Sequence, residues 1–181
     1  MSRIVLLDAS RGGSSFADRA AEAAGSLGPG CSHFRLEDLD IHYCTGCWTC
    51  WWKTPGRCVF TDGMERILPA MTTAELVIIA TPTLFGMPAA EMKKALDRTI
   101  PLVHPYIELV DGECHHRKRY PRYPKLALWA DTAGKGKDFA RIDTWVRRYA
   151  RNFHGPVVFS RNETAGAAEI AEEARYALGA V

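Results

Sequence analysis

The feature that most constrains the fold is a set of short apolar runs, each followed by a polar loop and a helix-like stretch. The runs are residues 4–7, 76–80, 126–130 and 156–159. Continuous runs of this length are typical of strands that are buried on both faces of a parallel sheet. A further strand is expected over residues 31–36, where polar residues are mixed in.

Helices are expected between and after these strands. The predicted ranges are 16–27, 63–71, 89–103, 138–153 and 165–178. Five strands alternating with five helices predict a three-layer α/β fold, in which a five-stranded parallel sheet carries helices on both faces. The flavodoxin-like strand order 2-1-3-4-5 is the commonest five-stranded arrangement, so we expect it here. With 181 residues and 47% apolar content, we expect a single domain over residues 1–181.

Composition excludes several classes of partner. The net charge of +2 gives no general electrostatic case for binding nucleic acid or an anionic membrane. No apolar run approaches the roughly 20 residues that cross a membrane, and the first residues do not resemble a signal peptide. We therefore expect a cytoplasmic protein with neither nucleic-acid nor membrane partners.

A cysteine-rich loop is expected over residues 42–62. It holds Cys44, Cys47, Cys50 and Cys58 in the spacing C-x2-C-x2-C-x7-C. Clustered thiols suit a metal centre or a redox thiol pair, and in the cytoplasm they favour these over structural disulfides. From the residues alone, zinc, a redox-active disulfide and free thiols under an aromatic lid all stay open.

Three polar loops follow strands whose carboxyl ends should meet at one edge of the sheet, namely residues 10–16, 81–87 and 131–136. The first offers helix-terminal N–H groups and serine hydroxyls to a phosphate, or it is a solvated turn with helix-capping serines. The second is unusually apolar for a surface loop, which suits the edge of a flat aromatic ligand. The third is ordinary loop chemistry taken alone.

Two segments resemble the NADPH-dependent FMN reductase family, which has a flavodoxin-like fold. One is Ser10-Arg11-Gly12-Gly13-Ser14-Ser15, and the other is Pro82-Thr83-Leu84-Phe85-Gly86-Met87-Pro88 with Lys93 and Leu96-Asp97-Arg98. The resemblance implies an FMN-dependent NAD(P)H oxidoreductase of the FMN or quinone reductase type. The FMN-binding residues that it implies are Ser10, Arg11, Gly13, Ser14, Ser15, Phe16, Pro82, Thr83, Leu84, Phe85, Gly86, Asp131, Thr132, Ala133 and Gly134.

Within that family, the cysteine loop resembles the compact motif of iron–sulfur flavoproteins. The resemblance implies that Cys44, Cys47, Cys50 and Cys58 hold a four-iron four-sulfur cluster. It also implies a nicotinamide nucleotide as electron donor, a small acceptor or redox partner protein, and a homodimer or homotetramer. The sequence shows no convincing nucleophile or general base, so we expect FMN to carry the chemistry with no catalytic side chain.

Two other classes of function compete with the reductase. One is a non-enzymatic iron–sulfur flavoprotein that passes single electrons between partner proteins. The other is a metal-binding structural or sensor module that uses this fold. Hydride transfer from NADPH to the flavin would distinguish the reductase from the electron carrier. Absence of bound flavin would favour the metal-binding module.

The segment over residues 104–124 is expected to be irregular, because it is basic and aromatic and contains three prolines. Within it, Arg117, Lys118 and Arg119 form a basic run that suits solvent, a subunit contact or the phosphates of a nicotinamide cofactor.

Overall fold

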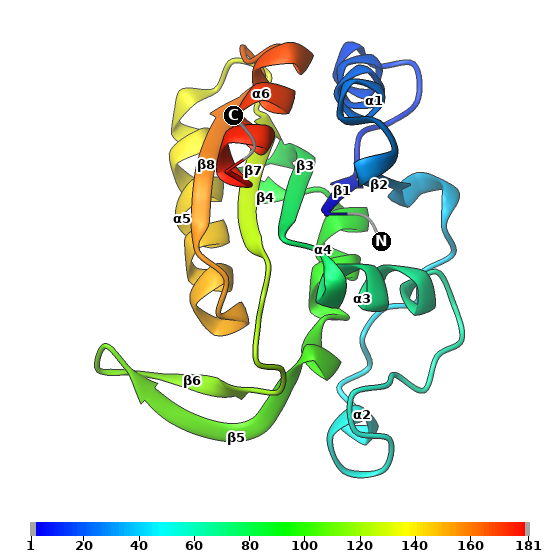
Figure 1. Ribbon diagram of the computed structural model, residues 1–181, viewed down its shortest axis with the longest axis vertical. Helices are drawn as coiled ribbons and strands as arrows, with labels where there is room; N and C mark the ends of the chain where they lie inside the picture. Colours follow the sequence, from blue (N-terminus) through cyan, green and yellow to red (C-terminus); the bar gives the residue numbers. More distant parts are fainter. Residues whose placement is uncertain (1–2, 180–181) are drawn as a thin grey trace.

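The computed structural model describes residues 3–179. Its central sheet has five parallel strands in the order β2-β1-β3-β7-β8. This is the predicted order 2-1-3-4-5, which confirms the expected fold (Figure 1). The strands are β1 (Ile4–Asp8), β2 (Cys31–Arg35), β3 (Leu76–Leu84), β7 (Lys125–Asp131) and β8 (Val157–Asn162).

Helices cover both faces of the sheet, as the alternating pattern predicts. One face carries α1 (Ser15–Leu27) and α6 (Ala167–Ala177), which pack against each other. The other face carries α3 (Met64–Thr73), α4 (Ala90–Asp97) and α5 (Gly136–Phe153). Shorter elements are α2 (Thr49–Trp52) and the 3-10 turns η1 (Gly28–Gly30), η2 (Leu36–Asp38) and η3 (Ile100–Leu102).

The first strand shows why the apolar runs identify the sheet. Val5 and Leu7 belong to the core under α3, α4 and α5, whereas Ile4 and Leu6 belong to the core under α1 and α6. Because successive side chains point to opposite faces, a strand between two helical layers must be apolar at every position.

The segment expected to be irregular instead forms a β-hairpin. Strands β5 (Val103–Val110) and β6 (Glu113–Lys118) pair antiparallel, and the hairpin extends from one end of the molecule (Figure 1). Asp111 and Gly112 both have positive φ, at 51° and 79°, which is the two-residue turn that hairpins favour. Pro105 is tolerated because it lies within the irregularity between Val103 and Ile107.

The helix predicted over residues 89–103 is also shorter than expected, since α4 ends at Asp97. Pro101 has no backbone N–H, so it cannot donate the hydrogen bond that a continuing α-helix would need there. Arg98 then turns inward to a buried ion pair with Asp62, 2.8 Å away. The chain continues through η3 into the hairpin.

Among residues 3–179, no helix combines the length and the apolar character that crossing a membrane requires.

Candidate functional site

The three predicted loops meet around a pocket of about 600 Å³ at the carboxyl edge of the sheet. Their strands β1, β3 and β7 are neighbours, so the loops that follow them converge there. The volume lies within the range of small-molecule sites. The predicted residues that line it are Ser10, Arg11, Ser14, Phe16, Pro82, Thr83, Leu84 and Asp131.

The other predicted site residues lie in the same loops but do not line this pocket. They are Gly13, Ser15, Phe85, Gly86, Thr132, Ala133 and Gly134. The pocket also has a wall that the predicted set lacks, built from β4 (Met87–Pro88) and the first turns of α4. Three residues of this wall belong to the segment that carries the family resemblance, namely Met87, Pro88 and Lys93. The resemblance therefore could have predicted the wall from the sequence.

Hydrogen bonds inside the first loop use both serine hydroxyl protons. Ser10 Oγ donates to Asp8 Oδ1 at 2.5 Å. Ser14 Oγ donates to Arg11 O at 2.7 Å and caps α1 by accepting from Ala17 N at 3.1 Å. Neither hydroxyl therefore has a proton left for a phosphate, although both line the pocket.

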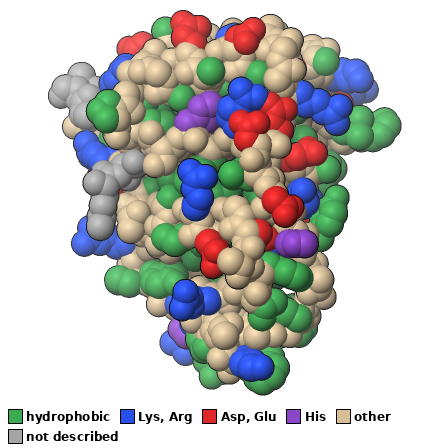
Figure 2. Space-filling model, turned by 90° about the vertical axis from the view of Figure 1, so that its right-hand side faces the viewer, with side chains coloured by type: hydrophobic (Ala, Val, Ile, Leu, Met, Phe, Trp, Pro, Cys, Tyr) green, Lys and Arg blue, Asp and Glu red, His purple; other side chains and the backbone are tan. Residues whose placement is uncertain are grey.

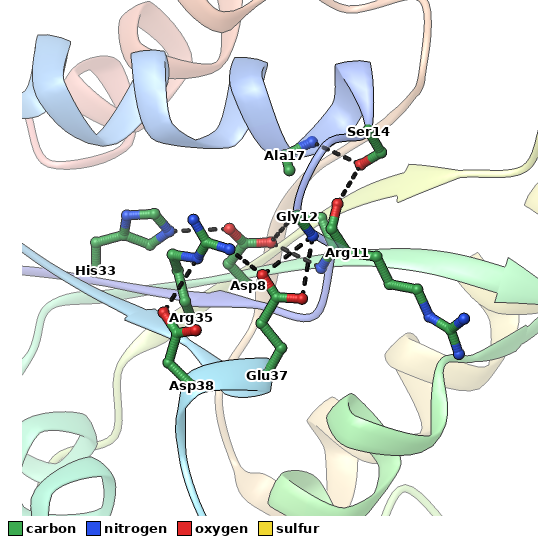
Figure 3. Close-up of polar contacts among 10 residues, drawn as sticks. Asp8, Arg11, Gly12, Ser14, Ala17, His33, Arg35, Glu37 and Asp38 are labelled. Atoms are coloured by element: carbon green, nitrogen blue, oxygen red, sulfur yellow. Dashed lines mark hydrogen bonds and ion pairs between the residues drawn. The ribbon is translucent and has the colours of Figure 1, made fainter.

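The first loop already holds a carboxylate from outside it. Gly12 N lies 3.0 Å from each carboxylate oxygen of Glu37, which follows β2 (Figure 3). A Cβ on Gly12 would lie 3.1 Å from Glu37 Oε1, so the carboxylate approaches the loop closely at this position. Glu37 was not predicted from the sequence because 25 residues separate it from Gly12.

The donors that remain in the first loop are suited to an anion. The backbone N–H groups of Gly13, Ser15 and Phe16 have no acceptor in the described part of the chain. The Arg11 guanidinium points away from the Glu37 cluster (Figure 3). Together they supply several N–H donors and a positive charge where α1 begins.

The second loop turns back on itself at Phe85 and Gly86, whose φ angles are 54° and 75°. A Cβ on Gly86 would lie 2.7 Å from Arg141 Cβ, so the turn also packs closely on α5. Beside the turn, Thr83 Oγ1 is buried and has no hydrogen-bond partner among the described residues. An unpaired buried hydroxyl beside a pocket indicates a site for a polar atom of a ligand.

Glu163 sets the shape of the third loop. It accepts hydrogen bonds from Thr132 N at 3.0 Å, Thr132 Oγ1 at 2.9 Å and Gly134 N at 2.6 Å. Burial raises the pKa of Glu163, but these hydrogen bonds outweigh it and the pKa lies below its ordinary value. The donors of Thr132 and Gly134 therefore face Glu163, Ala133 N donates to Asp131 Oδ1 at 3.0 Å, and only Asp131 of the loop lines the pocket.

A second, narrower pocket of about 20 Å³ gathers the four predicted metal ligands, Cys44, Cys47, Cys50 and Cys58. It lies near the hairpin, because Trp51 Nε1 donates to the carbonyl oxygens of Ile100 and Val103. Every cysteine of the chain is a free thiol. Residues 3–179 contain no group of three His, Cys, Asp or Glu side chains arranged to hold a single metal ion.

The four thiols are close enough to influence one another. Burial raises the pKa of Cys50 to about 11, and the charges of Cys58, Cys47 and Cys44 add to this effect. Hydrogen bonds with Thr49 lower the pKa of Cys47, which is exposed.

On the face shown in Figure 2, the visible acidic side chains lie in the upper and middle parts, and basic and hydrophobic ones occupy the lower end near the cysteine loop.

The basic run lies at the end of β6 and just after it, away from the larger pocket. Arg117 Nε is 3.6 Å from Glu108 Oε2 on the paired strand, and Arg119 Nη2 donates to Val103 O. The hairpin leads into the amino end of β7, whereas the larger pocket lies at the carboxyl end. These cations therefore do not belong to the larger pocket.

The fold and the larger pocket define a flavodoxin-like α/β protein with a pocket at the carboxyl edge of its sheet. A sequence model of the NADPH-dependent FMN reductase family matches residues 2–161, and the chain belongs to that family.

Two curated relatives are named iron–sulfur flavoproteins. One, from Methanocaldococcus jannaschii, is 36% identical over 67 residues, which are 37% of this chain and 34% of the relative. The other, from Archaeoglobus fulgidus, is 36% identical over 69 residues, which are 38% of this chain and 30% of the relative. The matches thus span about a third of each relative.

Solved structures confirm the fold. An NADH:FMN oxidoreductase in its apo form has a TM-score of 0.60 at 17% identity, over 99% of this chain and 87% of that chain. An FMN-dependent NADH-azoreductase from Bacillus anthracis in complex with FMN has a TM-score of 0.60 at 11% identity, over 99% and 98%. A WrbA-like flavodoxin from Agrobacterium tumefaciens has a TM-score of 0.58 at 15% identity, over 99% and 98%.

Proposed function

We propose that this protein is an FMN-dependent NAD(P)H oxidoreductase of the FMN or quinone reductase type. The observation that carries the proposal is the larger pocket: Arg11 and Phe16, whose backbone N–H is unpaired, line it together with an apolar loop that has one unpaired buried hydroxyl. This combination matches a ligand with a phosphate at one end and a planar ring with polar atoms at the other. Family membership supports the same ligand.

Each part of the pocket has a role in this proposal. Arg11 and the N–H groups of the first loop hold the phosphate, while Pro82 and Leu84 contact the ring and exclude water from one side. Thr83 Oγ1 orients the ring through a hydrogen bond to one of its polar atoms. When bound, FMN supplies the hydride and electron chemistry.

We further propose that the cysteine pocket holds a four-iron four-sulfur cluster. Four thiols on one pocket are the usual ligand set of such a cluster. The relatives named iron–sulfur flavoproteins support this proposal. Cys44 and Cys47 are exposed and Cys50 is buried, so the four thiols extend from the surface into the pocket.

The cysteine pocket also favours a second candidate, an electron carrier that performs no hydride transfer. It shares no residue with the FMN pocket, although Asp97 on its wall pairs with Lys93 of the FMN pocket at 2.6 Å across one turn of α4. Exposed apolar residues support a homo-oligomer, because such residues are typical of subunit contacts; they include Leu84, Phe85, Tyr106 and Leu109.

The test is anaerobic purification with FMN, iron and sulfide counted per chain, followed by addition of NADH or NADPH. Bleaching of the flavin absorbance by either nucleotide is expected for the oxidoreductase. Bound flavin that neither nucleotide reduces would instead support the carrier. Protein without flavin after incubation with FMN would overturn both.

The variant Thr83→Val tests the pocket itself, since it removes the unpaired hydroxyl but keeps the side-chain shape. We expect about fivefold weaker FMN binding, which corresponds to one hydrogen bond of about 1 kcal/mol. Thr83→Ser keeps the hydroxyl and is the matched control. Equal affinity in all three proteins would remove Thr83 from the site.

A further inference from the structure

The strongest unassigned feature is a buried guanidinium behind the cysteine pocket. Arg98 follows α4, is 1% exposed and forms part of the pocket wall. Its Nη1 donates to Asp62 Oδ2 at 2.8 Å and to His42 O at 2.7 Å, and its Nη2 donates to Asp62 Oδ1 at 3.2 Å. The outer nitrogens are therefore held by partners from the start and the end of the cysteine-rich segment.

Asp62 fixes this arrangement firmly. Its two oxygens also accept from His42 N at 3.0 Å and from Met64 N at 2.9 Å, and the latter bond caps the start of α3. The Arg98 guanidinium additionally lies over the Phe60 ring, with 5.1 Å between Cζ and the ring centroid. A charged group held from several sides keeps one orientation.

One nitrogen of Arg98 makes no hydrogen bond. Its Nε is buried and has no hydrogen-bond partner among the described residues. The charge of Arg98 interacts with Cys58, which lies on the same pocket. A buried ion pair seldom gives more stability than apolar residues of the same volume would, so its presence beside four thiols requires another reason.

We propose that Arg98 is the positioning residue of the cysteine site: it orients Cys58, compensates the negative charge of the four thiolates and raises the reduction potential of the group they hold. The inference rests on the cluster proposed above. The potential of a cluster depends on hydrogen bonds to its sulfur atoms and on nearby charge. Residues that support metal ligands typically contribute roughly 10- to 100-fold to metal affinity.

The experiment compares charge variants of the whole protein, purified without oxygen and reconstituted with iron and sulfide. The double variant Arg98→Gln/Asp62→Asn removes both charges and avoids leaving one of them buried alone. Of the two residues, Arg98 lines the cysteine pocket and Asp62 does not, so the loss of the positive charge dominates at the thiols. Arg98→Lys keeps the positive charge and is the conservative variant. Arg161→Gln/Glu173→Gln removes a different ion pair, between β8 and α6, and is the matched control.

The readouts are the rate of iron loss to a chelator and the reduction potential of the cluster. In the double variant we expect iron loss to be at least about tenfold faster. We also expect the ratio of reduced to oxidised cluster at a given potential to fall about tenfold, a shift of about 59 mV downward for a one-electron couple. Arg98→Lys should restore most of the potential, and the control pair should match the wild type. Unchanged FMN content shows that each variant is folded.

Two results would overturn the inference, and they are distinguishable. A double variant that binds FMN and matches the wild type in iron loss and potential would remove Arg98 from the site while leaving the cluster. A wild-type protein that binds FMN but takes up no iron on reconstitution would overturn the cluster itself.

Discussion

Both carboxylate oxygens of Glu37 lie 3.0 Å from the backbone nitrogen of Gly12, in the loop that we propose binds the FMN phosphate. The same carboxylate contacts Arg35, whose Nε is 3.3 Å from Asp38. The loop thus has the geometry of an anion site, but it already holds an anion from its own chain. A phosphate that binds the neighbouring N–H groups is repelled by this negative charge.

Removing the charge of Glu37 should strengthen FMN binding. Glu37→Gln keeps an oxygen that accepts from Gly12 N and removes the repulsion toward the phosphate. A repulsion of about 1 kcal/mol corresponds to roughly fivefold tighter binding. Quenching of FMN fluorescence at low salt measures it. Asp38→Asn is the control, because Asp38 also pairs with Arg35 but does not contact the loop. Weaker binding by Glu37→Gln would mean instead that the charge holds the loop in its binding shape.

Gly86→Ala should distort the second loop. The residue has a φ of 75°, and a Cβ there would lie 2.7 Å from Arg141 Cβ. We expect a loss of about 1–2 kcal/mol in the free energy of unfolding and weaker FMN binding. Gly25→Ala is the matched control, since Gly25 lies inside α1 with no atom within 4 Å of the added Cβ, and there alanine should stabilise the helix by roughly 0.5–1 kcal/mol. Urea unfolding measures both changes. Equal stability of the two variants would contradict the close packing on α5.

The fold could be predicted from the sequence because its strands carry the signal locally. Ile4, Val5, Leu6 and Leu7 are all buried, and only a sheet covered on both faces requires that pattern. The hairpin was not predicted because the prolines of this segment argue against regular structure. The signal for it was the Asp111-Gly112 pair, which is typical of a two-residue hairpin turn.

The site could be predicted only in part. Loop positions follow from the strand order, so Ser10, Thr83 and Asp131 were predicted and line one pocket. The groups that shape the loops could not be read from the sequence, because Glu37 and Glu163 act on residues 25 to 31 positions away. Burial of Arg98 depends on the same kind of distant pairing, here with Asp62.

Acid should loosen the hairpin from α5 through Glu113. Its carboxylate accepts from Arg148 at 2.8 Å, Arg151 at 3.0 Å and His115 at 3.2 Å. Hydrogen bonds from Arg148, then Arg151 and His115, lower the pKa of Glu113 from 4.5 to about 2. Because the folded pKa is depressed, the contribution to stability is complete above 4.5 and is lost as the pH falls toward about 2.

The measurement for Glu113 is the thermal unfolding midpoint as a function of pH. Glu113→Gln should flatten the acid side of the curve, and salt should weaken the wild-type effect because the carboxylate is exposed to solvent. Glu108→Gln is the control, since Glu108 has one ion-pair partner at 3.6 Å. If the curves of Glu113→Gln and the wild type coincide, Glu113 does not hold the hairpin.

Cys47→Ala should remove iron and leave FMN in place. Cys47 is one of the four thiols on the cysteine pocket, and a cluster that loses a ligand is less firmly held. The FMN pocket shares no residue with the cysteine pocket, so flavin binding should stay within about twofold of the wild type. Cys114→Ala is the matched control, because Cys114 is an exposed free thiol on β6 outside the pocket. Iron and FMN counted on the same anaerobic sample decide the result: equal iron in both variants would exclude Cys47 as a ligand, and joint loss of iron and FMN would show that the cysteine loop also supports the flavin site.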